Sequence, residues 1–245
     1  MEGSVGCRLC WMALLLIGLQ CNVLSISAVD GQSDPFIYGL CNVNKYTNGS
    51  EYESNVNMVL QSLVKATAAP NGGLATYDYG GVYGLVQCRP DVSHPDCQSC
   101  SAAASQLAYQ DCPNAIGARI QLGFCFIRYE NYSFASNLDT KVSYALENVK
   151  SSHDIQAFNH TLANLMETLA GEAPLNVNRF ATGAWVVNSS VTVYGLEMFL
   201  TTLAAPDCGM CLREAIRAMD ECCSSQIGAQ LYLGSCSVRF EINPF

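Results

Sequence analysis

A ladder of cysteines occurs twice in this chain, and the repeat constrains the fold more than any other feature. In the first copy the spacing is C-x8-C-x2-C-x11-C-x12-C, from Cys88 to Cys125. After a shift of 111 residues Phe199 replaces the first cysteine, and the other four recur as Cys208, Cys211, Cys223 and Cys236. Three flanking motifs keep the same offset: Val82-Tyr83-Gly84-Leu85 with Val193-Tyr194-Gly195-Leu196, Ile116-Gly117-Ala118 with Ile227-Gly228-Ala229, and Arg128-Tyr129-Glu130 with Arg239-Phe240-Glu241. The shared offset predicts a duplicated domain framed by disulfides.

The N-terminal residues have the pattern of a secretory signal. Arg8 precedes the apolar run 11–19, and the small residues of 25–28 follow it. This order predicts a signal peptide over residues 1–28. The apolar run is shorter than a membrane span, and no run of about 20 apolar residues follows it. We therefore expect a secreted, extracellular chain without a membrane span.

Secretion determines how the cysteines are interpreted. Of the 14 cysteines, Cys7, Cys10 and Cys21 fall in the signal, which leaves 11. In an oxidising compartment these are disulfide partners rather than metal ligands. The odd number leaves at least one thiol free or intermolecular, and this allows a covalent homodimer. Four sequons predict N-glycosylation on the same route, at Asn48, Asn131, Asn159 and Asn188.

The charge balance excludes some classes of partner. The net charge is −9, and the 12 Lys and Arg residues form no basic run. An acidic chain lacks the electrostatic attraction on which nucleic-acid binding depends, and anionic lipid surfaces are disfavoured for the same reason. Half of the residues are hydrophobic, enough for two cores of roughly 100 residues each.

Two domains of one design are expected, the first within residues 29–136 and the second within 137–245. The connection at 135–140 is short and polar, so the domains should touch. Each domain shows a strand, a helix, a hairpin, a second helix and two closing strands. Apolar stripes at helical spacing mark the first helix of each domain, at 54–67 and around 158–169. The second helix of the first domain should begin at Pro95, with Ser93 and Asp96 as a capping box. This order predicts an α+β fold, an antiparallel sheet packed against two helices.

The Cys97-x2-Cys100 pair permits three interpretations. A redox pair requires a thioredoxin-like βαβ unit, and a zinc site requires a second ligand pair. Neither context is present. Spacing of three residues puts both sulfurs on one helix face, where each can link the helix to a different strand. We expect this structural role, with no metal and no cofactor.

Catalytic motifs are not found. None of His94, His153 and His160 recurs in the other repeat, and no nucleophile elbow, zinc-protease or phosphate-loop motif occurs. A hydrolase would need paired carboxylates about 5–10 Å apart, which a sequence cannot place. We expect no enzyme. Five aromatic residues are interpreted as sheet packing: Tyr77, Tyr79, Tyr83, Trp185 and Tyr194.

The cysteine ladder and its flanks resemble the Gnk2-homologous domain of plants, also called DUF26 or the stress-antifungal domain. The resemblance includes Cys41-Asn42 upstream, and Gly117-Ala118-Arg119 and Tyr129-Glu130 downstream. Two copies behind a signal are similar to the cysteine-rich repeat secretory proteins. Membrane-anchored relatives include plasmodesmata-located proteins and cysteine-rich receptor-like kinases. The resemblance implies an apoplastic role in defence or stress.

A single-domain member of the family, ginkbilobin, is an antifungal lectin that binds mannose. The resemblance carries its binding residues over to Asn42, Arg119 and Glu130. An amide, a guanidinium and a carboxylate together supply donors and acceptors for sugar hydroxyls. The equal alternative is that Arg119 and Glu130 form a structural ion pair on neighbouring strands.

The second domain departs from this pattern. Asn148 and Glu241 are retained, but Gln230 replaces the arginine, so a sugar site there is not expected. The family's disulfides imply four bonds: Cys41–Cys112, Cys88–Cys97, Cys100–Cys125 and Cys211–Cys236. Glu147 and Phe199 remove two partners in the second domain. One hypothesis is that Cys208 bonds to Cys222 or Cys223.

Two functions follow from these observations. The first is a secreted defence or stress protein that binds mannose-type glycans or cell-wall polysaccharide through its first domain. The second is an apoplastic module that contacts another protein, such as a receptor-like kinase ectodomain, without binding sugar. The retained trio favours the first function, and the altered second domain favours the second.

Overall fold

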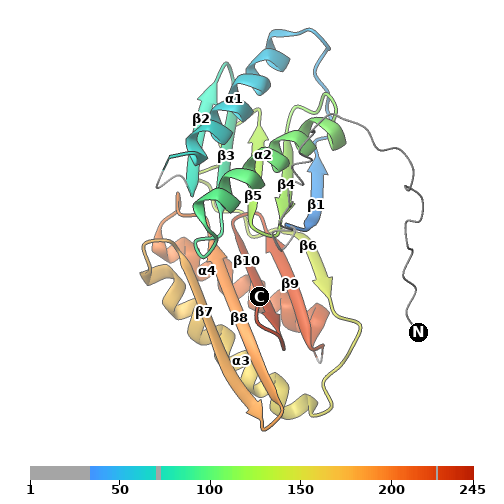
Figure 1. The fold of residues 1–245 in the computed structure, drawn as a ribbon, viewed down its shortest axis with the longest axis vertical. Helices are drawn as coiled ribbons and strands as arrows, with labels where there is room; N and C mark the ends of the chain where they lie inside the picture. Colours follow the sequence, from blue (N-terminus) through green and yellow to red (C-terminus); the bar gives the residue numbers. More distant parts are fainter. Residues whose placement is uncertain (1–33, 70–72, 225) are drawn as a thin grey trace, which may run out of the picture. The chain divides into compact units, whose positions relative to one another are not determined.

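Two five-stranded antiparallel sheets, each with two helices on one face, make up the described part of the chain (Figure 1). The computed structural model describes residues 34–69, 73–224 and 226–245. The expected signal peptide and its three cysteines lie outside the described residues. Within the described part, no helix combines the length and the apolar character that a membrane span needs.

The two halves repeat one order of elements, and this confirms the expected α+β fold. The first repeat contains β1 (Phe36–Cys41), α1 (Glu51–Thr67), β2 (Leu74–Tyr79), β3 (Val82–Cys88), α2 (His94–Asp111), β4 (Ala118–Leu122) and β5 (Cys125–Glu130). The second contains β6 (Val142–Glu147), α3 (Ile155–Glu172), the 3-10 helix η1 (Ala173–Leu175), β7 (Phe180–Asn188), β8 (Val191–Phe199), α4 (Ala205–Cys223), β9 (Gly228–Leu233) and β10 (Cys236–Glu241). The sheet orders are β1-β4-β5-β3-β2 and β6-β9-β10-β8-β7.

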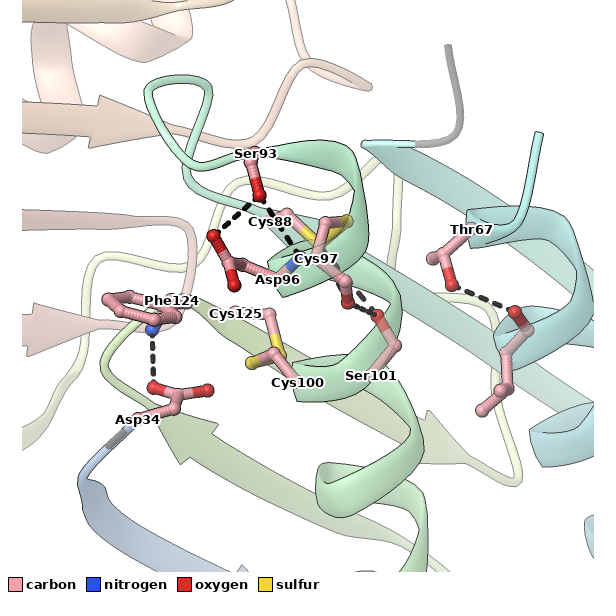
Figure 2. The surroundings of a disulfide bond; sticks show 11 residues. Asp34, Thr67, Cys88, Ser93, Asp96, Cys97, Cys100, Ser101, Phe124 and Cys125 are labelled. Carbon is pink, nitrogen blue, oxygen red and sulfur yellow. Dashed lines mark hydrogen bonds between the residues drawn. A yellow bond between two sulfur atoms is a disulfide. The ribbon is translucent and has the colours of Figure 1, made fainter. Parts of the chain in front are cut away.

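Polar caps fix where the helices of the first repeat begin. The Ser93 hydroxyl accepts a hydrogen bond from the Asp96 N–H at 3.3 Å and donates to the Asp96 carboxylate at 2.5 Å (Figure 2). α1 begins earlier than its apolar stripe predicts, because Ser50 caps it by accepting from the Glu53 N–H. The carboxylates of Glu51 and Glu53 in the first turn also stabilise the helix, because they interact favourably with the positive end of the helix dipole.

The glycine of the repeated Val-Tyr-Gly-Leu motif lets a helix lie directly on a strand. A Cβ atom on Gly84 of β3 would lie 2.4 Å from a Val59 methyl group of α1. At Gly195 of β8 it would lie 2.8 Å from Leu169 of α3. Both distances are shorter than van der Waals contact, so each motif requires glycine for the same packing reason.

Two disulfides connect α2 to the middle of its sheet. Cys97 bonds to Cys88 at the end of β3, and Cys100 bonds to Cys125 at the start of β5. Because Cys88 and Cys125 pair directly across these strands, one helical turn is fixed to two neighbours (Figure 2). A third bond, Cys41–Cys112, links β1 to the end of α2. These are the three bonds that the resemblance implies for this repeat.

The cysteines of the second repeat depart from our hypothesis. Cys211–Cys236 is present, but Cys222 bonds to its neighbour Cys223, and Cys208 is the one free cysteine among the described residues. A bond from Cys208 to either of them is therefore wrong. Cys208 lies in the first turn of α4 and the other two in its last, roughly 20 Å apart at 1.5 Å per residue. Since Cys208 is fully buried, it offers no accessible thiol for a covalent dimer.

The sheet faces that carry no helices pack against each other. Alternate residues of a strand point to opposite faces, yet every residue of β4 is buried. Leu85 and Phe126, which point away from α1 and α2, join the hydrophobic core of the second repeat. Gln87 donates to the Phe199 carbonyl at 3.1 Å and accepts from the Thr201 N–H at 3.4 Å. Residues 34–245 consequently form one compact unit.

Three of the aromatic residues that we interpreted as sheet packing are exposed. Tyr77, Tyr79 and Trp185 keep 38%, 51% and 39% of their surfaces accessible. All three lie on β2 or β7, which are the edge strands of their sheets. An edge strand has a neighbour on one side only, so large side chains there remain partly in solvent.

A carboxyl group is buried in the second core. Glu197 of β8 occupies the position that Val86 holds in β3, facing the helices. It has no exposed surface, and neither carboxyl oxygen has a hydrogen-bond partner. Burial raises the pKa of Glu197 to about 9, and the nearby Glu167 carboxylate adds to the increase. Glu197 is therefore protonated in the folded protein at neutral pH.

We expect Glu197 to make the protein less stable as the pH rises. The group ionises near pH 4.5 in the unfolded chain and near pH 9 in the folded one, so folding takes up a proton between these values. Stability should then decrease by about 1.4 kcal/mol per pH unit in that interval. Glu197→Val should remove this slope and be more stable at pH 7.5. Urea unfolding at pH 5.5, 6.5 and 7.5 measures how the free energy of unfolding depends on pH. Glu172→Gln, at an exposed position, is the control. Equal pH dependence in the two variants would contradict the prediction.

The cysteine arrangement makes a second prediction. The secreted protein should contain one free thiol. A disulfide-forming reagent should not react with this thiol in the native state and should titrate it as one equivalent in urea. Phe199→Cys should recreate the counterpart of Cys88–Cys97 and reduce the count to zero. Two further thiols in denatured wild type would show that Cys222 and Cys223 are not bonded.

Candidate functional site

The three residues of the predicted sugar site come together at one end of the first sheet. Asn42 follows β1, Arg119 lies in β4 and Glu130 ends β5, and β4 is the central strand of these three. All three line a pocket of about 250 Å³, named here the junction pocket because both repeats contribute to it. Its lining residues are Leu40, Cys41, Asn42, Gly117, Ala118, Arg119, Arg128, Glu130, Tyr132, Asp139, Ser143 and Gly234.

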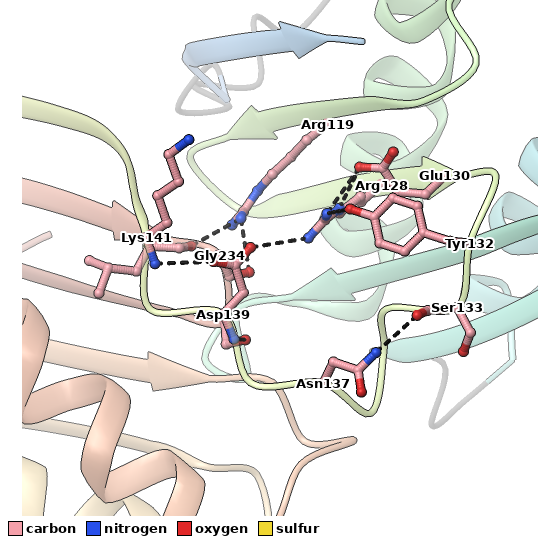
Figure 3. Close-up of polar contacts among 11 residues, drawn as sticks. Arg119, Arg128, Glu130, Tyr132, Ser133, Asn137, Asp139, Lys141 and Gly234 are labelled. Carbon is pink, nitrogen blue, oxygen red and sulfur yellow. Dashed lines mark hydrogen bonds and ion pairs between the residues drawn. The ribbon is translucent and has the colours of Figure 1, made fainter.

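Arg119 binds the second repeat. Its Nη1 donates to the carbonyl oxygens of Leu233 at 2.9 Å and of Gly234 at 3.0 Å, at the turn between β9 and β10 (Figure 3). The guanidinium carbon lies 4.7 Å from the centre of the Phe126 ring. Only 7% of the residue is exposed, and this burial lowers the pKa of Arg119. An arginine remains protonated even so, so a buried cation connects the repeats.

Glu130 pairs with Arg128 and not with Arg119. Nη2 of Arg128 lies 3.0 Å from Oε1 of Glu130 (Figure 3). Arg128 lies directly opposite Arg119 in the β4–β5 pair. Because Arg128 and Glu130 are alternate residues of β5, their side chains share one face of the sheet, and Arg128 is the arginine that reaches the Glu130 carboxylate. The Arg119–Glu130 ion pair is therefore wrong. Burial raises the pKa of Glu130, and the Arg128 charge acts against that increase.

The glycine of the Ile-Gly-Ala motif makes room for this carboxylate. A Cβ atom on Gly117 would lie 2.1 Å from Oε2 of Glu130. The second repeat shows the same arrangement, with 2.0 Å between a Cβ on Gly228 and Oε2 of Glu241. Both repeats thus hold a glutamate over a bare backbone position, which explains why these two motifs recur together.

Asn42 is held at the pocket by its own turn. Its N–H donates to the Gly117 carbonyl at 2.8 Å, and its Oδ1 accepts from the Asn44 N–H at 3.0 Å. Such an Asx turn fixes the side chain close to the backbone. Asn148 makes the equivalent bonds to Gly228 and Lys150.

Several pocket residues were not predicted. Arg128 donates to the Tyr132 hydroxyl at 3.0 Å, and its Nη1 lies 3.9 Å from the Asp139 carboxylate. Ser143 of β6 completes the lining on the second repeat. The repeated Arg-Tyr-Glu motif was a usable signal for Arg128. Asp139 and Ser143 carry no such signal, because only the packing of the two repeats brings them here.

The second repeat has no guanidinium at the equivalent place. The oxygen of Gln230 accepts from the Tyr232 hydroxyl at 2.7 Å. Glu241 still pairs with Arg239, at the longer distance of 3.6 Å. This agrees with the expectation that the trio is incomplete there.

A larger groove of about 580 Å³ also lies between the repeats, away from the predicted residues. Its main polar side chains are already paired. Arg89 binds Asp91 at 2.8 Å, and Gln87 holds the backbone of Phe199 and Thr201. We therefore place the candidate site at the smaller junction pocket.

The predicted glycosylation positions differ in their surroundings. Asn48, Asn131 and Asn188 are exposed, in a turn, in a bend and at the end of β7. Asn159 is partly buried within α3. One further group with metal-ligand atoms, Asp34 with Cys100 and Cys125, is not a metal site, because its two sulfurs form a disulfide.

We expect Arg119→Met to weaken the contact between the repeats. The substitution keeps most of the apolar stem but leaves the Leu233 and Gly234 carbonyls without their charged donor, at a cost of about 2–3 kcal/mol. Urea unfolding measures this. Arg213→Met, on the exposed side of α4, is the control and should change stability by less than about 0.5 kcal/mol. Equal effects would show that the Arg119 bonds contribute nothing.

Comparison with known proteins agrees with these features. The model of the family described as salt stress response/antifungal matches residues 40–132 and 145–243. An antimicrobial ginkbilobin-2-like protein of Castanea crenata is 32% identical over 224 residues, which is 91% of this chain and 92% of the relative. Cysteine-rich repeat secretory protein 38 of Arabidopsis thaliana is 32% identical over 97% of this chain and 96% of its own length.

A solved structure shares the fold. The tandem DUF26 ectodomain of the Arabidopsis thaliana cysteine-rich receptor-like protein PDLP8 superposes with a TM-score of 0.77 at 28% identity, over 86% of this chain and all of that one. The duplicated cysteine ladder, the paired sheets and these matches lead to one conclusion: the chain belongs to the plant salt stress response/antifungal family and carries two tandem copies of its Gnk2-homologous (DUF26) domain.

Proposed function

We propose that this protein is a secreted stress-response or defence protein that binds mannose-type carbohydrate in the junction pocket. The observation that carries the proposal is the convergence of Asn42, Arg119 and Glu130, from three separate segments, on one open pocket. The antimicrobial relative in Castanea crenata supports the defence role.

The chemistry of the pocket suits a neutral sugar. The Asn42 amide group and the Arg128 guanidinium are donors, and the carboxylates of Glu130 and Asp139 are acceptors. Tyr132 is 50% exposed at the rim, where an aromatic ring can pack against the apolar face of a sugar. These donors and acceptors suit the neighbouring hydroxyl groups of a hexose, and charged partners strengthen such bonds.

The size of the pocket limits the ligand. Pockets for drug-sized ligands span about 300–1,000 Å³, and the junction pocket has about 250 Å³. We therefore expect it to hold a single sugar residue, such as the terminal mannose of a longer glycan. Further residues of that glycan would extend into solvent.

Glu130 is a better test position than Arg119. Removing Arg119 would also weaken the contact between the repeats, so a loss of binding would have two explanations. Glu130→Gln keeps the shape of the side chain and removes its charge. Because a hydrogen bond to a charged group contributes about 1.5–3 kcal/mol, we expect mannose affinity to fall at least tenfold.

Calorimetric titration with mannose, and with mannan, tests the proposal. The secreted protein is first trimmed with glycosidase, because its own N-glycans would carry mannose. Glu241→Gln is the matched control, since it changes the equivalent glutamate of the second repeat, where Gln230 replaces the arginine. We expect saturable binding by wild type and Glu241→Gln and weak binding by Glu130→Gln. A folded wild type that does not bind mannose would falsify the proposal.

A second candidate function is supported by Arg119 itself. Its Nη1 is committed to the second repeat, so this nitrogen is not available to a sugar. The shared fold with a receptor-like ectodomain suits a module that contacts other proteins. Interferometry with a purified tandem DUF26 ectodomain tests this alternative: binding unaffected by mannose and by Glu130→Gln would favour it, and no binding would oppose it.

A further inference from the structure

A third pocket, which shares no lining residue with the junction pocket or the larger groove, lies between the two helices of the second repeat. Its volume is about 270 Å³. It is lined by Asn159, Leu162 and Ala163 of α3, by Met219, Asp220 and Cys223 of α4, and by Ser224 and Phe240. We call it the helix pocket. It is mostly apolar, with one amide, one carboxyl and one hydroxyl group, from Asn159, Asp220 and Ser224.

Tyrosines occupy the same region of the first repeat. The rings of Tyr46 and Tyr52 lie 5.6 Å apart. The hydroxyls of Tyr52 and Tyr129 donate to the carbonyls of Ile116 at 2.7 Å and Ala115 at 3.0 Å. Tyr109 of α2 belongs to the same cluster: burial raises its pKa to about 12, and Tyr46 adds to the increase.

The repeat alignment shows what the second copy has lost. The cysteine-ladder offset of 111 residues places Asp220 at the position of Tyr109 and Phe240 at that of Tyr129. The N-terminal part of each repeat is related by 106 residues, as the bridges Lys45–Ala115 and Ser151–Gln226 show.

That second offset places Ser152 at the position of Tyr46 and Phe158 at that of Tyr52. Two aromatic rings and all four phenolic hydroxyls are therefore missing from the second repeat. Met219, which replaces Ala108 of the first repeat, restores only part of the volume.

The helix pocket also contains an acceptor without a donor. Oδ1 of Asn159 is buried and has no hydrogen-bond partner. Leaving such a group unpaired costs about 1–3 kcal/mol. Asp220 is exposed at the edge, and partial burial raises the pKa of its carboxyl group. If the Asn159 amide group rotated toward the pocket, an incoming molecule with a hydrogen-bond donor would satisfy this oxygen.

We propose that the helix pocket is a binding site for a small phenol in the chain that carries no glycan at Asn159. The aromatic ring would occupy the space of the missing tyrosine rings, against Leu162, Met219 and Phe240. The Asn159 amide group would rotate toward the pocket, and the phenol hydroxyl would donate to its Oδ1. Apolar cavities of about 150 Å³ bind benzene, so this volume accepts a substituted ring. The site is independent of sugar binding at the junction pocket.

Titration with p-cresol, the tyrosine side chain itself, tests the proposal. The full mature chain is secreted by a bacterial host, so that Asn159 carries no glycan, and its methionine methyl groups are labelled with ¹³C. We expect p-cresol to shift the Met219 methyl resonance saturably, and toluene, which lacks the donor, to bind at least fivefold more weakly. No shift at Met219 with p-cresol would overturn the proposal.

Two variants locate the site. Asp220→Tyr restores the residue of the first repeat and should abolish p-cresol binding, while circular dichroism and the thermal midpoint show that the fold is kept. Asn159→Leu should remove the preference for p-cresol over toluene. If Asp220→Tyr fails to fold, Asn159→Leu still tests the proposal. A preference for p-cresol over toluene that is equal in Asn159→Leu and in wild type would contradict the assigned hydrogen bond.

Discussion

The contact between the helix-free faces of the two sheets is the constraint on which the rest of this structure depends. In an isolated repeat, Leu85 and Phe126 would be exposed, and burial of apolar surface stabilises by about 25 cal/mol per Å². The same contact buries Arg119 and Gln87, so their polar atoms must find partners across it. Both find backbone carbonyls of the second repeat. Apolar burial and fixed polar partners together set how one sheet sits on the other.

Duplication has left two copies with different internal support. The first repeat has three disulfides between separate elements, and a cluster of tyrosines closes its helix layer. In the second repeat one such bond remains, Cys222 and Cys223 bond only to each other, and Glu197 is buried without a partner. Fewer cross-links leave the unfolded chain more conformational freedom. The second copy therefore depends more on its apolar core and on its contact with the first.

The candidate sugar site shows how packing can change the role of a retained residue. Arg119 is the residue type that the family pattern requires, yet its hydrogen bonds go to Leu233 and Gly234. Arg128, Asp139 and Ser143 bring new polar groups to the same pocket. The resulting site belongs to both repeats, so a ligand there would contact the junction and not one domain alone. Binding of a ligand at this pocket would therefore depend on how the two repeats pack.

Some features could be predicted from the sequence because they depend on local pattern. The order of strands and helices follows from apolar periodicity, and the start of α2 follows from Ser93. The disulfides of the first repeat were implied by the family that the cysteine ladder resembles. The repeated glycines were visible in the sequence, but only the structure shows that each lets a helix or a carboxylate approach the backbone closely. The start of α1 was misplaced by a few residues, because the polar residues that cap it lie outside the apolar stripe.

The tertiary structure alone decided the rest. The partner of Arg119, the isolation of Cys208, the burial of Glu197 and the two pockets depend on residues far apart in the chain. A sequence pattern shows which residue types are present, and the hydrogen bonds of a buried group depend on which backbone atoms packing brings within about 3 Å. Phe199 illustrates the difference: the sequence shows that a cysteine is missing, and only the packed core shows that Cys208 is then left buried and alone.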